Sequence, residues 1–143
     1  MLLELTIKNF AIIPFLHIDF HQGMTALTGE TGAGKSIIID AMGLLAGGRS
    51  SSDYIRHGEE KCLLEGVFEW PTQPEFFALM EELGIDQSES FLIVQRDMSR
   101  SGKNICRLNG RAVPLVQLRR VGTYLVDIQG QNDTQQLLNQ DEH

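Results

Sequence analysis

The sequence of 143 residues has few cysteines and no long apolar run. Neither of its two cysteines, Cys62 and Cys106, belongs to a Cys-x-x-Cys pair, which argues against a zinc site and a disulfide framework. No apolar stretch reaches the roughly 20 residues that a membrane-spanning helix needs. The first five residues, MLLEL, have no basic segment and an early glutamate, unlike a secretory signal peptide. We therefore expect a cytoplasmic protein without a membrane partner, with both thiols in or near its core.

Metal-binding and nucleophilic patterns are also missing. The four histidines show no spacing typical of metal ligands, and no histidine and aspartate arrangement accompanies a serine. Acidic residues outnumber basic residues by 19 to 12, which gives a formal net charge of −7. The basic residues are concentrated, however, between Arg96 and Arg120, where the sequence contains seven of them and a single acidic residue, Asp97. This segment is either a patch that contacts phosphates or a solvated hairpin whose arginines pair with acidic neighbours such as Glu81, Glu82 and Glu89.

The chain does contain the complete phosphate-binding pattern G-x-x-x-x-G-K-[ST], the Walker A motif or P-loop. The expected nucleotide-binding residues are Gly29, Glu30, Thr31, Gly32, Ala33, Gly34, Lys35, Ser36 and Ile37. The glycines let the backbone bend so that N–H groups point at phosphate oxygens. A helix that starts near Gly34 directs the positive end of its dipole at the same anion. We expect Lys35 to reach the β- and γ-phosphates and to act in catalysis, and the Ser36 hydroxyl to ligate Mg²⁺.

Hydrophobic periodicity predicts the elements around this loop. Strands are expected at residues 3–9, 15–20 (after a bend at Pro14), 24–28, 62–70, 91–96, 104–108 and 124–128. Helices are expected at residues 36–46 and 75–83, with a helical turn or two over 114–120 and a further start at 134–139. The pair Asn109-Gly110 is a tight-turn signal that allows positive φ.

Antiparallel strands on both sides of the phosphate loop favour the head of an ABC-type ATPase over a nucleotide kinase. In a compact kinase, strands and helices would alternate directly after the loop. We therefore expect an α/β P-loop NTPase fold: the N-terminal lobe of an ABC/SMC-type head, with an antiparallel β subdomain around the phosphate loop.

Several segments together resemble the start of the bacterial RecN family of DNA repair proteins, which are SMC-like ATPases. They are residues 5–13, 27–41, 53–58, 109–111 and 125–131, so the resemblance covers essentially the whole chain. The most specific local cue is the Gly29-Glu30-Thr31-Gly32 version of the loop. In that family a head is assembled from N- and C-terminal lobes joined by a long coiled coil, and ATP is sandwiched between two heads.

The resemblance implies that residues 1–143 are the N-terminal lobe of such a head, acting in DNA double-strand-break repair and recombination. It implies ATP and Mg²⁺ as cofactors. The implied partners are the C-terminal lobe of the same protein, a second head in a homodimer, and DNA, which the complete protein would contact at the nucleoid. The chain has no L-S-G-G-type signature, heptad coiled coil or hhhhDE strand, so we expect ATP hydrolysis only after the other lobe and a second head complete the site. We also expect the isolated lobe to expose apolar surface and to be marginally stable or prone to aggregate.

Gln131 resembles the Q-loop glutamine of related heads, which touches Mg²⁺ and the site of the attacking water. A neutral amide suits this position because it ligates a cation and orients water without adding charge. An ordinary loop glutamine is the alternative, and Gln129 and Gln135 compete for the role. Asp127 supports an alternative hypothesis for the function of the chain, because an apolar run followed by aspartate is typical of the magnesium-holding strand end of P-loop enzymes. On that reading the chain would be a self-sufficient small P-loop NTPase or kinase.

Arg56 follows the first helix in a loop. Related SMC heads carry an arginine in a comparable loop near nucleotide and DNA, so the resemblance makes Arg56 a candidate contact with DNA or with the second head. The alternative is a surface arginine paired with Glu59 or Glu60. Ile12 and Ile13 are either neighbours of the adenine or ordinary core residues.

Overall fold

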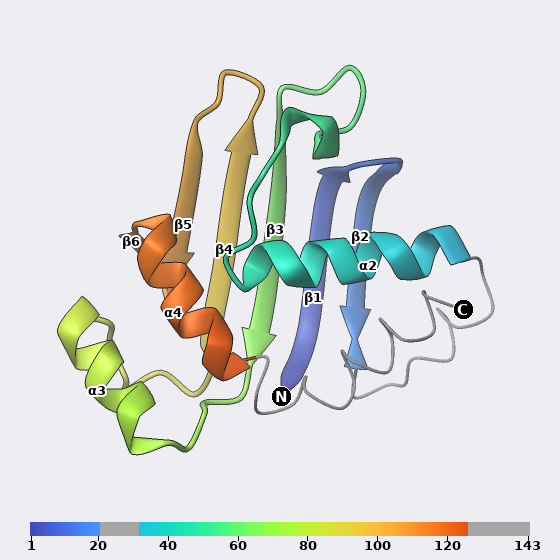
Figure 1. Cartoon of the computed structure of the whole chain (residues 1–143). Helices are drawn as coiled ribbons and strands as arrows, with labels where there is room; N and C mark the ends of the chain where they lie inside the picture. Colours follow the sequence, from blue (N-terminus) through green and yellow to red (C-terminus); the bar gives the residue numbers. More distant parts are fainter. Residues whose placement is uncertain (21–31, 126–143) are drawn as a thin grey trace.

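The structure, a computed structural model, describes residues 1–20 and 32–125 and consists of one antiparallel sheet with helices on one side (Figure 1). Its strands are β1 (Leu2–Phe10), β2 (Ile13–Asp19), β3 (Lys61–Phe68), β4 (Leu92–Ser99), β5 (Asn104–Leu108) and β6 (Arg111–Val113). Its helices are α2 (Gly32–Leu45), α3 (Pro74–Leu83) and α4 (Leu115–Leu125), with a 3₁₀ turn η2 (Ser52–Tyr54). The six strands lie in the order β2-β1-β3-β4-β5-β6.

Period-two alternation places one face of this sheet in the core. In β3 and β4 every second residue is buried, and the register pairs the buried Leu64 with the buried Arg96. The intervening residues lie on the opposite face and are half-buried, except for the exposed Lys61. The predicted antiparallel strands are therefore confirmed, with ends that differ by a few residues.

Helix α2 crosses the buried face of the sheet and ends beside β4, and α4 lies on the same side (Figure 1). Ile38, Ala41 and Leu45 of α2 are buried, at the three- and four-residue spacing of one helix face. The helix begins at Gly32, earlier than the predicted start. Helix α3 has Pro74 at its first position and ends at Gly84, whose φ of 73° lies in the left-handed region.

The turn signal at Asn109-Gly110 is confirmed. Asn109 has φ of 48° and Gly110 has φ of 85°, the pair of positive values that a type I′ turn requires. This turn joins β5 to β6, a three-residue strand that the sequence pattern did not predict.

Two predictions about the backbone were wrong. The chain does not bend at Pro14: Pro14 lies within β2, and the turn is at residues 11–12. Proline fits there because β2 is an edge strand of the described sheet, where a missing N–H is tolerated. The strand predicted from Tyr124 is also wrong at its start, because Tyr124 and Leu125 belong to α4, whose buried residues 118, 121, 122 and 125 keep a helical period. The strand predicted at 24–28, the remainder of 124–128 and the helix start at 134–139 lie outside the described residues.

The cysteines occupy the core as predicted, since Cys62 and Cys106 are 2% and 4% exposed. Large exposed apolar side chains in the described part of the chain are scattered over different elements: Met1, Ile12, Phe15, Phe91 and Val116. Ile12 is 72% exposed and is therefore not a core residue, whereas Ile13 packs partly against the core. Within residues 1–20 and 32–125, no helix has the length and apolar character to cross a membrane.

Candidate nucleotide-binding site

Lys35 and Ser36 lie one after the other at the start of α2, both half-buried. The helix begins inside the phosphate-binding pattern, so its first main-chain N–H groups have no partner within the helix and carry the positive end of its dipole. Its first turn contains no acidic side chain that would neutralise this charge. The donor set is therefore a lysine ammonium, a serine hydroxyl and main-chain N–H groups, which fits a phosphorylated ligand and a magnesium ion.

Of the other residues expected at the nucleotide, some belong to α2 and some lie outside the described residues. Gly32, Ala33 and Gly34 belong to the first turn of α2, and Ile37, in the turn that follows, is buried. Gly29, Glu30 and Thr31 lie outside the described residues, as do Asp127, Gln129, Gln131 and Gln135. Their predicted roles stay predictions.

Arg56 lies just after η2, in a loop that is fixed to the end of β1. Its main-chain N–H donates to the carbonyl oxygen of Asn9 at 2.8 Å, and the N–H of Ala11 donates to the carbonyl of Tyr54 at 2.6 Å. The rings of Phe10 and Tyr54 stack with centroids 5.3 Å apart. The described residues show no ion pair between Arg56 and Glu59 or Glu60, and the Nε of Arg56 is buried without a hydrogen-bond partner. The loop is thus held through its backbone, and the proposed pairing of Arg56 with those glutamates is wrong.

A residue of the basic segment holds the same loop from the other side. The side chain of Arg100 donates from Nε to the carbonyl of Glu59 at 2.6 Å and from Nη2 to the carbonyl of Arg56 at 3.1 Å. Arg100 follows β4 directly, so the hairpin β4–β5 carries a cation that ties down the loop of Arg56. In the sequence, Arg100 was visible only as positive charge.

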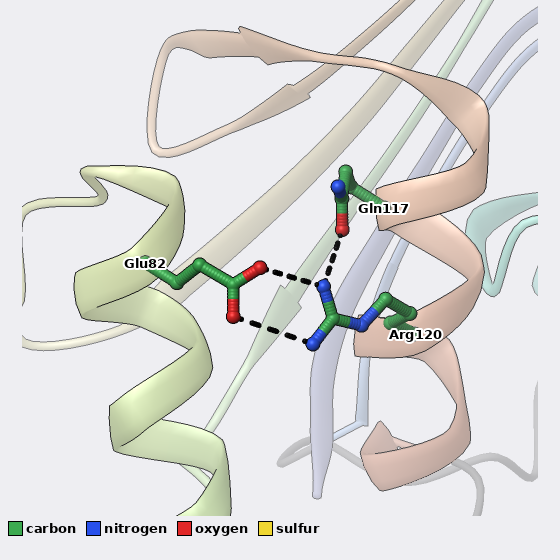
Figure 2. A network of polar contacts seen from close by, with 3 residues as sticks. All are labelled: Glu82, Gln117 and Arg120. Carbon is green, nitrogen blue, oxygen red and sulfur yellow. Dashed lines mark hydrogen bonds and ion pairs between the residues drawn. The ribbon is translucent and has the colours of Figure 1, made fainter.

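Two further arginines of the segment, Arg107 and Arg120, pair with carboxylates. Arg107 pairs with Asp97 on the face of the sheet opposite the core. Arg120 of α4 donates to the Glu82 carboxylate of α3 at 2.9 Å and to Gln117 at 2.8 Å (Figure 2). The Arg120 guanidinium lowers the pKa of Glu82. The pairing of an arginine with Glu82 is therefore confirmed, whereas Glu81 and Glu89 form no ion pair among the described residues.

Arg96 lies on the core face of β4, a position that the sequence pattern indicated but that was not predicted. It shares parity with Leu92 and Val94 on β4, and alternation puts all three on the core face. Arg96 is 1% exposed and is bound to the C-terminal end of α2. An arginine in phase with buried apolar residues was the available signal.

Comparison with known proteins shows which sequences and folds this chain resembles. Residues 4–69 match the family model described as AAA domain. The chain is 51% identical over its whole length to the DNA repair protein RecN of Bacillus subtilis (strain 168), and it spans 25% of that relative. The chain matches the N-terminal portion of RecN. The match to RecN thus spans about a quarter of the length of the curated relatives.

Solved structures agree on the fold of this RecN-like segment. A structure described as "Structural biochemistry of ATP-driven dimerization and DNA stimulated activation of SMC ATPases" superposes with a TM-score of 0.63 at 24% identity, covering 86% of this chain and 78% of that one. The SMC head domain from Thermotoga maritima superposes with a TM-score of 0.56 at 25% identity, covering 83% of this chain and 41% of the other. The RecN-like chain therefore has the P-loop fold of an SMC-type head, with an antiparallel sheet and helices, as the sequence predicted.

Proposed function

We propose that the chain binds Mg-ATP as the N-terminal lobe of a RecN-like head, and that the complete protein uses ATP-gated association of heads in DNA double-strand-break repair and recombination. The observation that carries this proposal is that Lys35 and Ser36, the last two residues of the phosphate-binding pattern, lie at the start of α2. The 51% identity to RecN of Bacillus subtilis supports the biological role.

The chemistry assigned to these residues is mostly electrostatic. Main-chain N–H groups at the start of α2 bind phosphate oxygens, and the Lys35 ammonium neutralises charge on the β- and γ-phosphates. The Ser36 hydroxyl and the Gln131 amide would hold Mg²⁺, which supplies further positive charge at the phosphates. Phosphoryl transfer needs chiefly such positioning and charge stabilisation.

Hydrolysis needs groups that residues 1–143 do not supply, so we assign it to the head completed by the C-terminal lobe and by a second head. One similar structure is described in terms of ATP-driven dimerisation and DNA-stimulated activation of SMC ATPases, which supports the same cycle here. Within that cycle Arg56 is our candidate for contact with DNA or with the opposite head, because its loop is held by main-chain hydrogen bonds to the end of β1 and by the side chain of Arg100.

The experiment is ATP turnover by the chain alone and then after addition of a purified C-terminal lobe. We expect activity only after mixing, because the lone lobe lacks the signature segment and the catalytic glutamate. Gln131→Ala in the complete protein should then reduce turnover, and unchanged turnover would remove Gln131 from the site.

The alternative, a self-sufficient small P-loop NTPase or kinase that uses Asp127, depended on a strand from Tyr124 to Ile128. Because α4 continues through Leu125, at least two residues of that strand are helical. Turnover by the lone chain that Asp127→Asn abolishes would nevertheless favour the alternative over the composite head.

A further inference from the structure

The C-terminal end of the phosphate-binding helix α2 is closed by a Schellman motif. The N–H of Gly48 donates to the carbonyl of Gly43 at 2.9 Å, and the N–H of Gly47 donates to that of Leu44 at 3.0 Å. Gly47 has φ of 105°, which a residue with a side chain rarely adopts. The last carbonyls form the negative end of the helix dipole, and the last turn of α2 contains no basic residue of its own.

Two arginines from other elements supply the missing positive charge. Arg96 of β4 donates from Nη1 to the carbonyl oxygens of Leu44, at 2.8 Å, and of Gly48. Arg119 of α4 donates from Nε to the carbonyl of Gly47 at 3.0 Å. The helix end is thus bound on one side by the sheet and on the other by a second helix.

The guanidinium of Arg96 is costly to bury. Arg96 is 1% exposed, its Nε has no hydrogen-bond partner, and burial lowers its pKa. Within the described residues no carboxylate forms an ion pair with it. Its charge is therefore balanced chiefly by main-chain carbonyls at the end of α2, and an apolar side chain of the same length would fill the site at less cost.

We propose that Arg96 and Arg119 are positioning residues for the nucleotide, acting through α2. The helix has 14 residues and is about 20 Å long, so a change of tilt at its C-terminal end would displace Lys35 and Ser36 at the other end. The two arginines fix this tilt relative to β4 and α4. This inference rests on the proposed function, because it assigns a role at the nucleotide site of that function.

The test replaces the donors and keeps the volume: Arg96→Met and Arg119→Met in the full-length protein that carries this chain. Affinity for a non-hydrolysable ATP analogue is measured with Mg²⁺ by equilibrium titration, at a temperature at which every variant is folded. The control is Leu79→Ala on α3, a buried position outside the α2 cap that lowers stability by leaving a cavity. Arg119 is exposed, so Arg119→Met should change stability little and tests the inference independently of Arg96→Met.

Both arginine variants should bind the analogue about fivefold or more weakly than the control, since couplings through packed elements are of this size. Their amides at Gly47 and Gly48 should exchange hydrogen faster, and Arg96→Lys should recover part of the affinity. Affinities equal to that of Leu79→Ala would overturn the inference alone. Failure of the unsubstituted full-length protein to bind nucleotide would overturn the proposed function and the inference with it.

Discussion

Gly122 of α4 lies so close to Ala46 that a Cβ at position 122 would be 2.0 Å from the Ala46 carbonyl oxygen. Main chain therefore touches main chain where α4 meets the end of α2. Gly122→Ala should push the two helices apart and lower the free energy of unfolding by about 1–3 kcal/mol, the usual cost of overpacking. Urea denaturation followed by circular dichroism measures this loss.

Gly43 supplies the matched control, because it lies on α2 and a Cβ there would meet nothing within 4 Å. Gly43→Ala should leave stability unchanged or raise it by up to about 1 kcal/mol through helix propensity. Equal effects of the two substitutions would contradict the close approach of α4 to α2.

The ion pair of Arg120 with Glu82 should give a pH-dependent contribution to stability. Because Arg120 lowers the pKa of Glu82 in the folded state, the contribution is present above the ordinary pKa of glutamate, 4.5. It is lost as the pH falls through the lowered value. Glu82→Gln should therefore lower the melting temperature slightly at pH 7, and the difference should vanish in acid. The effect is small because both side chains are exposed.

Glu81→Gln is the control for that experiment, since Glu81 is an exposed neighbour on α3 without an ion pair to a described residue. It should not alter the melting temperature at either pH. A Glu82→Gln difference that persists below the lowered pKa would mean that the carboxylate charge is not its source.

The two thiols should be inert in the folded protein. Burial raises the pKa of Cys62 to about 11 and raises that of Cys106 as well, so little thiolate forms near neutral pH. Iodoacetamide at pH 8 should label neither cysteine in the native chain and both in urea. The raised pKa of Cys62 contributes to stability fully below its ordinary value of 9.0, and the contribution declines as the pH rises towards 11. Rapid labelling of the native chain would contradict the buried positions.

Arg100 should matter for the loop of Arg56 more than for global stability. Arg100→Met removes the donors to the carbonyls of Glu59 and Arg56, so the amides of Arg56 and Glu59 should exchange hydrogen faster. Lys103→Met is the control, because the Lys103 ammonium in the same hairpin has no hydrogen bond or ion pair with another described residue. Unchanged exchange in the Arg100 variant would show that main-chain bonds alone hold the loop.

Local rules predicted much of this fold. Alternation placed β1, β3, β4 and β5, and Asn109-Gly110 placed the turn after β5, because each signal depends only on neighbouring residues. The phosphate-binding pattern likewise placed Lys35 and Ser36 at the start of a helix. Tertiary packing decided the rest: Tyr124 has the β propensity of an aromatic residue, but it lies within α4, whose buried residues 118, 121, 122 and 125 keep a helical period.

The roles of the arginines could not be predicted from sequence spacing. Arg96 lies about 50 residues beyond the carbonyl that it binds, and Arg119 about 70 residues beyond its own. Composition shows such residues only as positive charge. Their partners are main-chain carbonyls, which carry no sequence signal, so only the fold reveals them.

The most direct test of the central claim is an equilibrium titration of the full-length protein with Mg-ATP, beside Lys35→Ala. Lys35 lies at the start of α2 and is assigned to the β- and γ-phosphates, so we expect saturable binding by the unsubstituted protein and none by the variant. Equal affinity of the two proteins, or no binding by either, would contradict a nucleotide site at this helix.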